Sequence, residues 1–249
     1  MPPLPAELSP RCYPSPTSPW VMAQSWHDLL FMHWPVDPVQ LAKVLPPQLP
    51  LDTFEGQAYL AVVPFRMSGV RPRLFPPVPG LSAFPELNVR TYVTIAGKPG
   101  VYFFSLDAGN AIAVAIARAL FHLPYYNARM ALSRAGDEIA YASERTHRGA
   151  ASAALHAIYR PVAPVEYALP GSLEYWLTAR YCMYPVDASG QVYRGEIDHP
   201  PWPLQRAKVD LSSCTMTNPI PLPLTGAPPL VHFSQRLDVV VWPLTKITI

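Results

Sequence analysis

The sequence predicts a mainly β, α+β domain with a few short helices. The chain carries 33 prolines among its 249 residues, spread along its whole length, and prolines interrupt long helices. Half of the residues are apolar and only 14% are charged, which is enough apolar material for one large core. Short runs rich in Val, Tyr and Phe alternate with glycine and proline turns, as is typical of folds built from many strands.

Seven runs are expected to form strands, because they are rich in β-branched and aromatic residues and end at turn residues. They cover residues 26–34, 58–67, 86–95, 101–107, 139–145, 153–160 and 231–242. The third and fourth runs should form a hairpin through a turn at 97–100. The proline-rich stretch 69–85 is predicted to be a long loop.

Three short helices are expected, each after a residue whose side chain can cap the first turn. These residues are Asp37, Asn110 and Ser172. The helices should end near residues 45, 121 and 181. Residues 1–19 are proline-rich and are interpreted as an arm. Residues 20–249 show no repeat and no second composition regime, which indicates a single domain.

The composition disfavours several classes of function. A net charge of +2 without a basic cluster argues against nucleic-acid partners and anionic membrane surfaces. The longest apolar stretch, 111–117, is far shorter than the roughly 20 residues of a membrane helix. An odd number of cysteines and no secretory leader favour a cytoplasmic protein with free thiols. No phosphate-binding glycine motif and no histidine pair with metal-site spacing are present, so neither cofactor nor metal is expected.

The 86–92 run carries an unusual row of polar residues. Because side chains alternate along a strand, Glu86, Asn88, Arg90 and Tyr92 share one face, with apolar residues on the other. Such a row forms either the wall of a polar cavity or an ordinary solvent-facing surface, and the second is the more common.

Two further residues are candidates for a site. Arg118 is the single charged residue of the expected 111–121 helix, so it either reaches solvent or pairs with a buried carboxylate. We hypothesise a pair with Glu86 or Asp107. His199 lies beside a carboxylate and close to Trp202, although ordinary packing of a proline-stiffened loop explains this segment equally well.

Several motifs between residues 24 and 243 are distinctive in combination. They are Phe84-Pro85-Glu86-Leu87-Asn88-Val89-Arg90, Gly100-Val101-Tyr102-Phe103-Phe104, Leu123-Pro124-Tyr125, His199-Pro200-Pro201-Trp202 and His232-Phe233-Ser234. This set resembles the YqjF-like family, an uncharacterised bacterial family of the acetoacetate decarboxylase-like superfamily. The resemblance implies a closed or nearly closed antiparallel β-barrel or curled sheet with a few short helices and a central cavity. Homo-oligomers are common in the superfamily, so the resemblance leaves a homo-oligomer open.

The resemblance also shows which catalytic group is missing. In acetoacetate decarboxylase a lysine forms a Schiff base with the ketoacid, and a neighbouring lysine lowers its pKa. The element that resembles this pair carries Tyr125 and Tyr126 instead, while Glu86 resembles the decarboxylase's active-site glutamate. The four lysines of the chain, Lys43, Lys98, Lys208 and Lys246, have no basic neighbour to lower their pKa. Schiff-base decarboxylation is therefore not expected.

Two functions remain open. The favoured one is binding of a small carboxylate or ketone in the cavity, with Asn88, Arg90, Arg118 and His199 as ligand-binding residues. The alternative is a lyase or enolising enzyme, with Glu86 as acid or base and Tyr125 or Tyr126 polarising a carbonyl. The state of Glu86 distinguishes them, because a catalytic base would have a raised pKa and face a cavity, whereas a structural glutamate would be held by an arginine.

A third and weaker hypothesis concerns the proline-rich segment 219–229, which could dock onto an aromatic-lined partner module.

Overall fold

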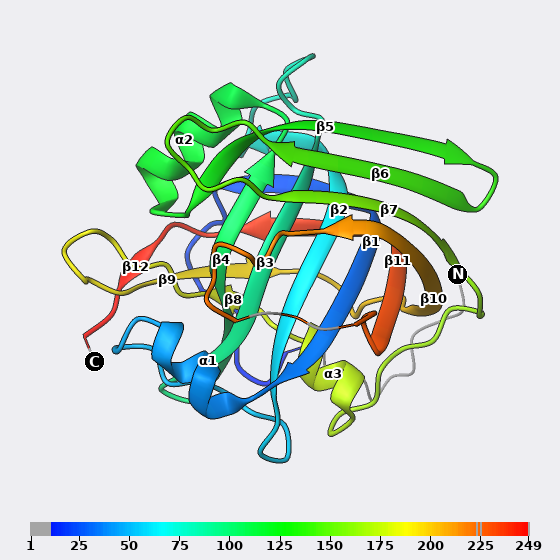
Figure 1. Ribbon diagram of the computed structural model, residues 1–249. Coiled ribbons are helices and arrows are strands. Elements are labelled where there is room, and N and C mark those ends of the chain that lie inside the picture. The colour runs from blue at the N-terminus through cyan, green and yellow to red at the C-terminus, as the bar shows by residue number, and fades with distance from the viewer. Residues whose placement is uncertain (1–10, 223, 225, 249) are drawn as a thin grey trace.

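A computed structural model describes residues 11–222, 224 and 226–248 of the chain (Figure 1). Twelve strands form one continuous sheet. They are β1 (Met22–Val36), β2 (Ala58–Pro72), β3 (Phe84–Ile95), β4 (Lys98–Ala108), β5 (Tyr125–Ala135), β6 (Glu138–Arg145), β7 (Ala154–Pro161), β8 (Cys182–Met183), β9 (Tyr193–Asp198), β10 (Gln205–Cys214), β11 (Leu230–Val241) and β12 (Thr245–Lys246). The predicted β-rich class is confirmed.

The sheet closes into a barrel of nine strands. Its order is β4-β3-β2-β1-β11-β10-β7-β6-β5, and a short parallel pairing of β5 with β4 completes the ring. A buried ion pair links β6 to β4 near this junction. Arg145 of β6 donates from Nε and Nη2 to the two carboxylate oxygens of Asp107 on β4, both at 2.7 Å. The remaining pairs of neighbouring strands in this ring are antiparallel.

A second closure gives the sheet its distinctive form. Strand β9 pairs with β11 and β8 pairs with β4, so β8 and β9 bridge the outer side of the five strands β4, β3, β2, β1 and β11. We call these five strands the shared wall, since they belong to both rings. Their side chains alternate between two enclosed spaces rather than between a core and solvent.

The two faces of the shared wall differ in chemistry. One face, which includes Leu87 and Val89 of β3, packs inside the nine-stranded barrel against Tyr141 and Tyr159 of β6 and β7. The opposite face carries the row Glu86, Asn88, Arg90 and Tyr92, all of them buried. The predicted alternation is confirmed, and the prediction that a polar row usually faces solvent does not hold here.

Three helices cover the ends and the outer side of the sheet. They are α1 (Pro38–Val44), α2 (Ala111–Phe121) and α3 (Leu173–Thr178). The side chains of Asp37, Asn110 and Ser172 cap them as predicted, although α3 ends three residues earlier than expected. Helix α2 lies beside β5, above the outer side of the shared wall (Figure 1).

Some boundaries were predicted wrongly. The β3–β4 turn is Ala96-Gly97 rather than 97–100, and both residues have positive φ angles, 49° and 71°, as a tight hairpin requires. Strands β5, β8, β9, β10 and β12 correspond to none of the seven predicted ranges. In β10 the partly buried residues Ala207, Val209 and Leu211 alternate with exposed polar ones, so the period-two signal was present in the sequence.

The ends of the chain bear on two other predictions. Residues 1–10 of the expected arm lie outside the described residues. Arg11 forms an ion pair with Glu196 at 2.9 Å, which places residue 11 against β9. Within the segment 219–229, Ile220 and Leu222 are buried in the barrel core, which argues against a free docking segment. No helix in the described part of the chain is long and apolar enough to cross a membrane.

Candidate functional site

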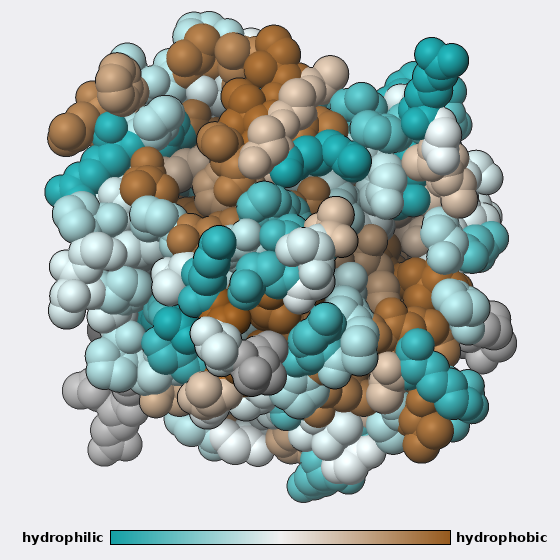
Figure 2. All heavy atoms as spheres, turned by 90° about the vertical axis from the view of Figure 1, so that its left-hand side faces the viewer, coloured by the Kyte–Doolittle hydropathy of each residue, from teal (hydrophilic) through white to brown (hydrophobic). Residues whose placement is uncertain are grey.

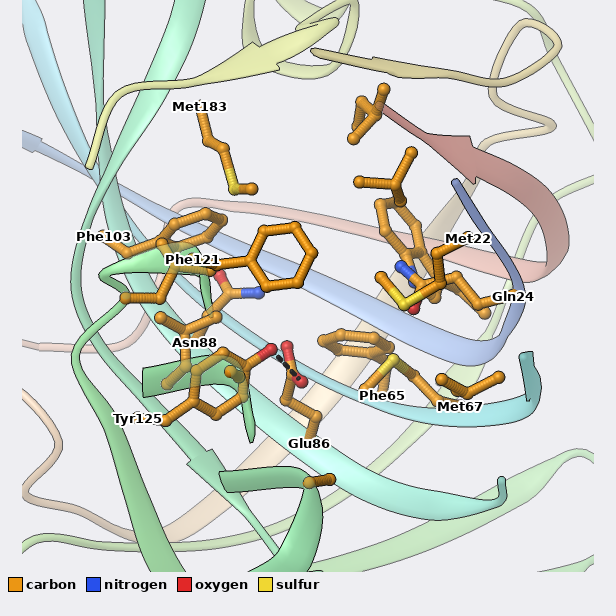
Figure 3. Close-up of a pocket in the computed structure, with 18 of the residues that line it drawn as sticks. Met22, Gln24, Phe65, Met67, Glu86, Asn88, Phe103, Phe121, Tyr125 and Met183 are labelled. Carbon is orange, nitrogen blue, oxygen red and sulfur yellow. Dashed lines mark hydrogen bonds between the residues drawn. The ribbon is translucent and has the colours of Figure 1, made fainter. Parts of the chain in front are cut away.

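A cavity of about 510 Å³ lies between the outer face of the shared wall, helix α2 and the β8–β9 bridge. Most of its lining is apolar, from Leu29, Val63, Phe65, Met67, Phe84, Phe103, Phe121, Leu123 and Met183. The buried polar residues in its lining are few, namely Ser82, Glu86, Asn88, Arg90, Thr178, Arg180 and His199, and the partly buried Tyr125 lies among them. Figure 3 shows Glu86, Asn88 and Tyr125 pointing into one space that Phe121 and Met183 border on the other side. A concave, mostly apolar site with a few converging polar groups is typical of small-molecule binding.

Glu86 and Tyr125 form a hydrogen-bonded pair in the cavity wall. The Tyr125 hydroxyl donates to Oε2 of Glu86 at 2.7 Å (Figure 3). The backbone of Glu86 is held from the opposite side of the sheet, because the Tyr141 hydroxyl in the barrel core donates to its carbonyl oxygen at 2.7 Å. Strand β5 therefore holds the carboxyl group of Glu86, and strand β6 holds its backbone.

Burial controls the charge of Glu86. The carboxyl group is 3% exposed, and this desolvation raises its pKa to about 8. The hydrogen bond from Tyr125 opposes the rise, and the nearby carboxylate of Asp107 adds to it. Glu86 is consequently protonated at neutral pH, and no described arginine forms an ion pair with it.

Arg90 is a buried cation without a counter-ion. Its side chain lies on β3 four residues beyond Glu86 and is 9% exposed. Its Nε has no hydrogen-bond partner, and none of the described carboxylates pairs with the guanidinium. It lies over Phe31 and Tyr92, with centroids at 5.3 and 6.0 Å. The Oδ1 atom of Asn88, two residues away on the same face, is also buried and unpaired.

Arg180 adds a second guanidinium that the sequence analysis did not place in the site. It donates to Oδ2 of Asp52 from Nη1 at 2.6 Å, and its Nη2 is buried without a partner. The guanidinium stacks over Trp176 at 4.2 Å and Tyr92 at 4.9 Å. Because Asp52 balances one of the two arginines and Glu86 is neutral, this buried part of the site carries an excess positive charge.

His199 also lines the cavity, as a neutral ring. Its Nδ1 donates to the carbonyl oxygen of Pro200 at 2.8 Å, and burial lowers its pKa to about 4. The ring stacks on Tyr181, with centroids 4.4 Å apart, and meets Trp202 edge-on. These contacts fix its orientation, so it presents a rigid polar edge among aromatic rings.

Two residues predicted for the site lie outside the cavity lining. Arg118 is exposed and donates to the backbone oxygen of Tyr125 at 2.7 Å, so the hypothesis that it pairs with Glu86 or Asp107 is wrong. Asp107 is held by Arg145 instead. Tyr126 points to the other face of β5, where its ring stacks on that same Arg145 at 4.2 Å. Alternation along β5 separates Tyr125 from Tyr126.

None of the four lysines lines the cavity. Lys98, the one that is partly buried, pairs with Glu196 at 3.1 Å. A metal site has no support either, since the part of the chain that the structure describes holds no group of three metal-ligating side chains. What converges here is an acid, a phenol, an amide and two guanidinium groups.

Comparison with known proteins gives the family. The model of DUF2071, described as "Uncharacterized conserved protein", matches residues 23–238. The chain belongs to this family. It is 46% identical to "Uncharacterized protein YqjF" of Bacillus subtilis (strain 168) over 231 residues, which cover 93% of this chain and 94% of that protein. The resemblance to YqjF-like proteins is thereby confirmed.

Solved structures confirm the fold. The acetoacetate decarboxylase of Legionella pneumophila superposes with a TM-score of 0.61 at 14% identity, covering 95% of this chain and 93% of the other. The enduracididine biosynthesis enzyme MppR, in complex with pyruvate, superposes with a TM-score of 0.64 at 11% identity, covering 93% and 91%. At these identities the likeness establishes an acetoacetate decarboxylase-like architecture.

The raised pKa of Glu86 predicts a specific dependence of stability on pH. Between the unfolded value of 4.5 and the folded value of about 8, the folded state binds the extra proton, so the free energy of unfolding falls as pH rises. In Glu86→Gln this loss is absent. Between pH 5 and pH 9, the free energy of unfolding measured in urea should fall by about 3–5 kcal/mol more in the native protein than in the variant.

The matched control is Glu138→Gln, on the exposed surface of β6, which should follow the native protein at both pH values. Parallel pH dependence of the native protein and Glu86→Gln would show that the buried carboxyl group is already ionised at neutral pH.

Proposed function

We propose that this protein binds a small organic acid, with the carboxylate held by Arg90. The observation that carries the proposal is the buried Arg90 guanidinium at the wall of a mostly apolar cavity, which hydrogen-bonds Tyr92 but has no carboxylate partner among the described residues. A charge in such a place costs free energy unless a counter-ion accompanies it, and an arginine matches the two oxygens of a carboxylate geometrically. Nη2 of Arg180 supplies a further donor without a partner. Asn88 can contact a carboxylate only through its amide nitrogen, since its unpaired Oδ1 is an acceptor.

The neighbouring structures support the same class of ligand. One of them, MppR, holds pyruvate, a small 2-oxo acid, and others are acetoacetate decarboxylases, named for another oxo acid. Neither relationship identifies the ligand of this chain. Pyruvate and acetoacetate are both small oxo acids, which is the ligand class proposed for the present cavity.

Arg90→Met tests the proposal, with hexanoate and its neutral analogue hexanamide as probes. The native protein should bind hexanoate more tightly than hexanamide. In the variant this preference should disappear, at a cost of about 2 kcal/mol or more in the binding of hexanoate measured by calorimetric titration. Arg160→Met, which removes an exposed arginine on β7, should leave both affinities unchanged.

Stability separates a ligand-binding arginine from a structural one in the same variant. Removing an uncompensated buried charge should leave the melting temperature unchanged or raise it. A large fall in melting temperature, or hexanoate binding as tight as in the native protein, would contradict the assignment of Arg90.

A second candidate function, proton transfer next to a carbonyl, is favoured by the state of Glu86. A catalytic base is expected to have a raised pKa and access to a cavity, and Glu86 has both. In this reaction the carboxylate form of Glu86 would take a proton from a carbon next to a carbonyl. The bonding electrons would move to the carbonyl oxygen, and the Tyr125 hydroxyl would donate to the enolate.

Deuterium exchange at C3 of 2-oxohexanoate tests this reaction by proton NMR in D₂O. The native protein should accelerate the exchange, and the rate should rise as pH passes through about 8, because the base is the deprotonated form. Glu86→Gln should abolish the acceleration, whereas Glu138→Gln should keep it. Equal rates for Glu86→Gln and the native protein would leave binding alone as the function of the cavity.

A further inference from the structure

The buried charged groups of the cavity lie at one wall, and most of the remaining lining is apolar, with Gln24, Arg71 and Ser82 as its further polar residues. The unpaired donors of Arg90 and Arg180 belong to the shared wall and the α3–β8 connection. Most of the remaining lining consists of apolar side chains, many of them from β1, β2, β4 and α2. A ligand that satisfies both parts must itself have one charged end and a long apolar remainder.

The size of the cavity exceeds what a short oxo acid needs. Its volume of about 510 Å³ lies in the range of pockets that enclose drug-sized molecules. An acid of three or four carbons would leave most of the apolar lining without contact. Such a ligand would gain little from the hydrophobic surface that makes up the larger part of the site.

Helix α2 presents an apolar surface where the cavity reaches solvent. Ile112, Ile116 and Leu120 are 55%, 51% and 65% exposed, and all three also line the cavity. Val78 and Leu81, in the segment 73–83 between β2 and β3, are likewise both exposed and part of the cavity lining. We call these five residues the apolar mouth. Figure 2 looks onto the side of the molecule where α2 lies, and apolar atoms gather over the upper part of that face.

The mouth is continuous with the interior, which separates it from an isolated surface patch. Phe121 at the end of α2 faces the same space as Glu86 and Asn88 (Figure 3). An apolar path therefore runs from exposed residues on α2 to the arginines at the inner wall. Contiguous exposed apolar surface of this kind marks a site of interaction.

We propose that the ligand is an amphiphilic carboxylate, with its head group on Arg90 and its hydrocarbon chain running through the cavity to the apolar mouth. This inference rests on the proposed function for the head group and adds the length and apolar character of the tail. Arg90 fixes the orientation, because it is buried without a carboxylate partner and the five mouth residues are uncharged. Arg71, the further arginine of the lining, is only partly buried and donates to the backbone oxygen of Gly69.

A series of straight-chain saturated carboxylates from butanoate to dodecanoate tests the inference by calorimetric titration. Affinity should rise about fourfold with each added methylene, as expected for burial of apolar surface, and should level off once the chain emerges from the mouth. In the double variant Ile116→Ser/Leu120→Ser, the affinity of decanoate should fall about tenfold or more while that of butanoate stays the same.

The matched control is Ile158→Ser, an exposed isoleucine of similar exposure on β7 that does not line the cavity. It should bind the whole series as the native protein does. Arg90→Met should weaken every member by a similar factor, because it removes the contact to the head group that all of them share.

The outcomes separate this inference from the proposed function. Binding of all chain lengths with equal affinity would overturn the amphiphile and leave the organic-acid site intact. Absence of binding for every carboxylate would overturn both. A double variant that changes the oligomeric state in light scattering, with the chain-length dependence unaltered, would show that α2 covers a second copy of this chain and would overturn the inference.

Discussion

Strand β3 is buried on both of its faces, and the rest of the site depends on this constraint. In an ordinary barrel, alternate residues of a strand face solvent, where a glutamate or an arginine costs little. Here the β8–β9 bridge and helix α2 cover the outer face, so Glu86, Asn88 and Arg90 project into a mostly apolar cavity. The low polarity of that space then determines the charge of each group.

Three ionisable side chains line the buried part of the cavity, Glu86, His199 and Arg90, and burial does not affect them all in the same way. Glu86 takes up a proton, because protonating its buried carboxyl group costs less free energy than keeping an isolated carboxylate there. His199 stays neutral for the same reason. An arginine cannot lose its proton, so Arg90 remains charged and unpaired. The protein thus keeps a positive charge on the same face of β3 as an acid that can release a proton, which is the combination that an organic acid with a reactive carbonyl would use.

The sequence predicted what depends on local pattern and missed what depends on long-range pairing. Caps at Asp37, Asn110 and Ser172 and the alternation of β3 follow from neighbouring residues. The partner of Asp107 does not, because Arg145 reaches it only through the return of β6 across the barrel. Arg180 was missed for a similar reason, since it follows a short helix and no spacing links it to β3. The double burial of β3 depends on β9 pairing with β11, which no local signal shows.

The most direct test of the account is a crystal structure of the protein with 6-bromohexanoate, in which anomalous scattering from bromine locates the tail. The account predicts carboxylate oxygens within hydrogen-bonding distance of the Arg90 guanidinium and bromine toward helix α2. A carboxylate bound elsewhere, or an Arg90 side chain turned onto a carboxylate of the protein itself, would contradict it.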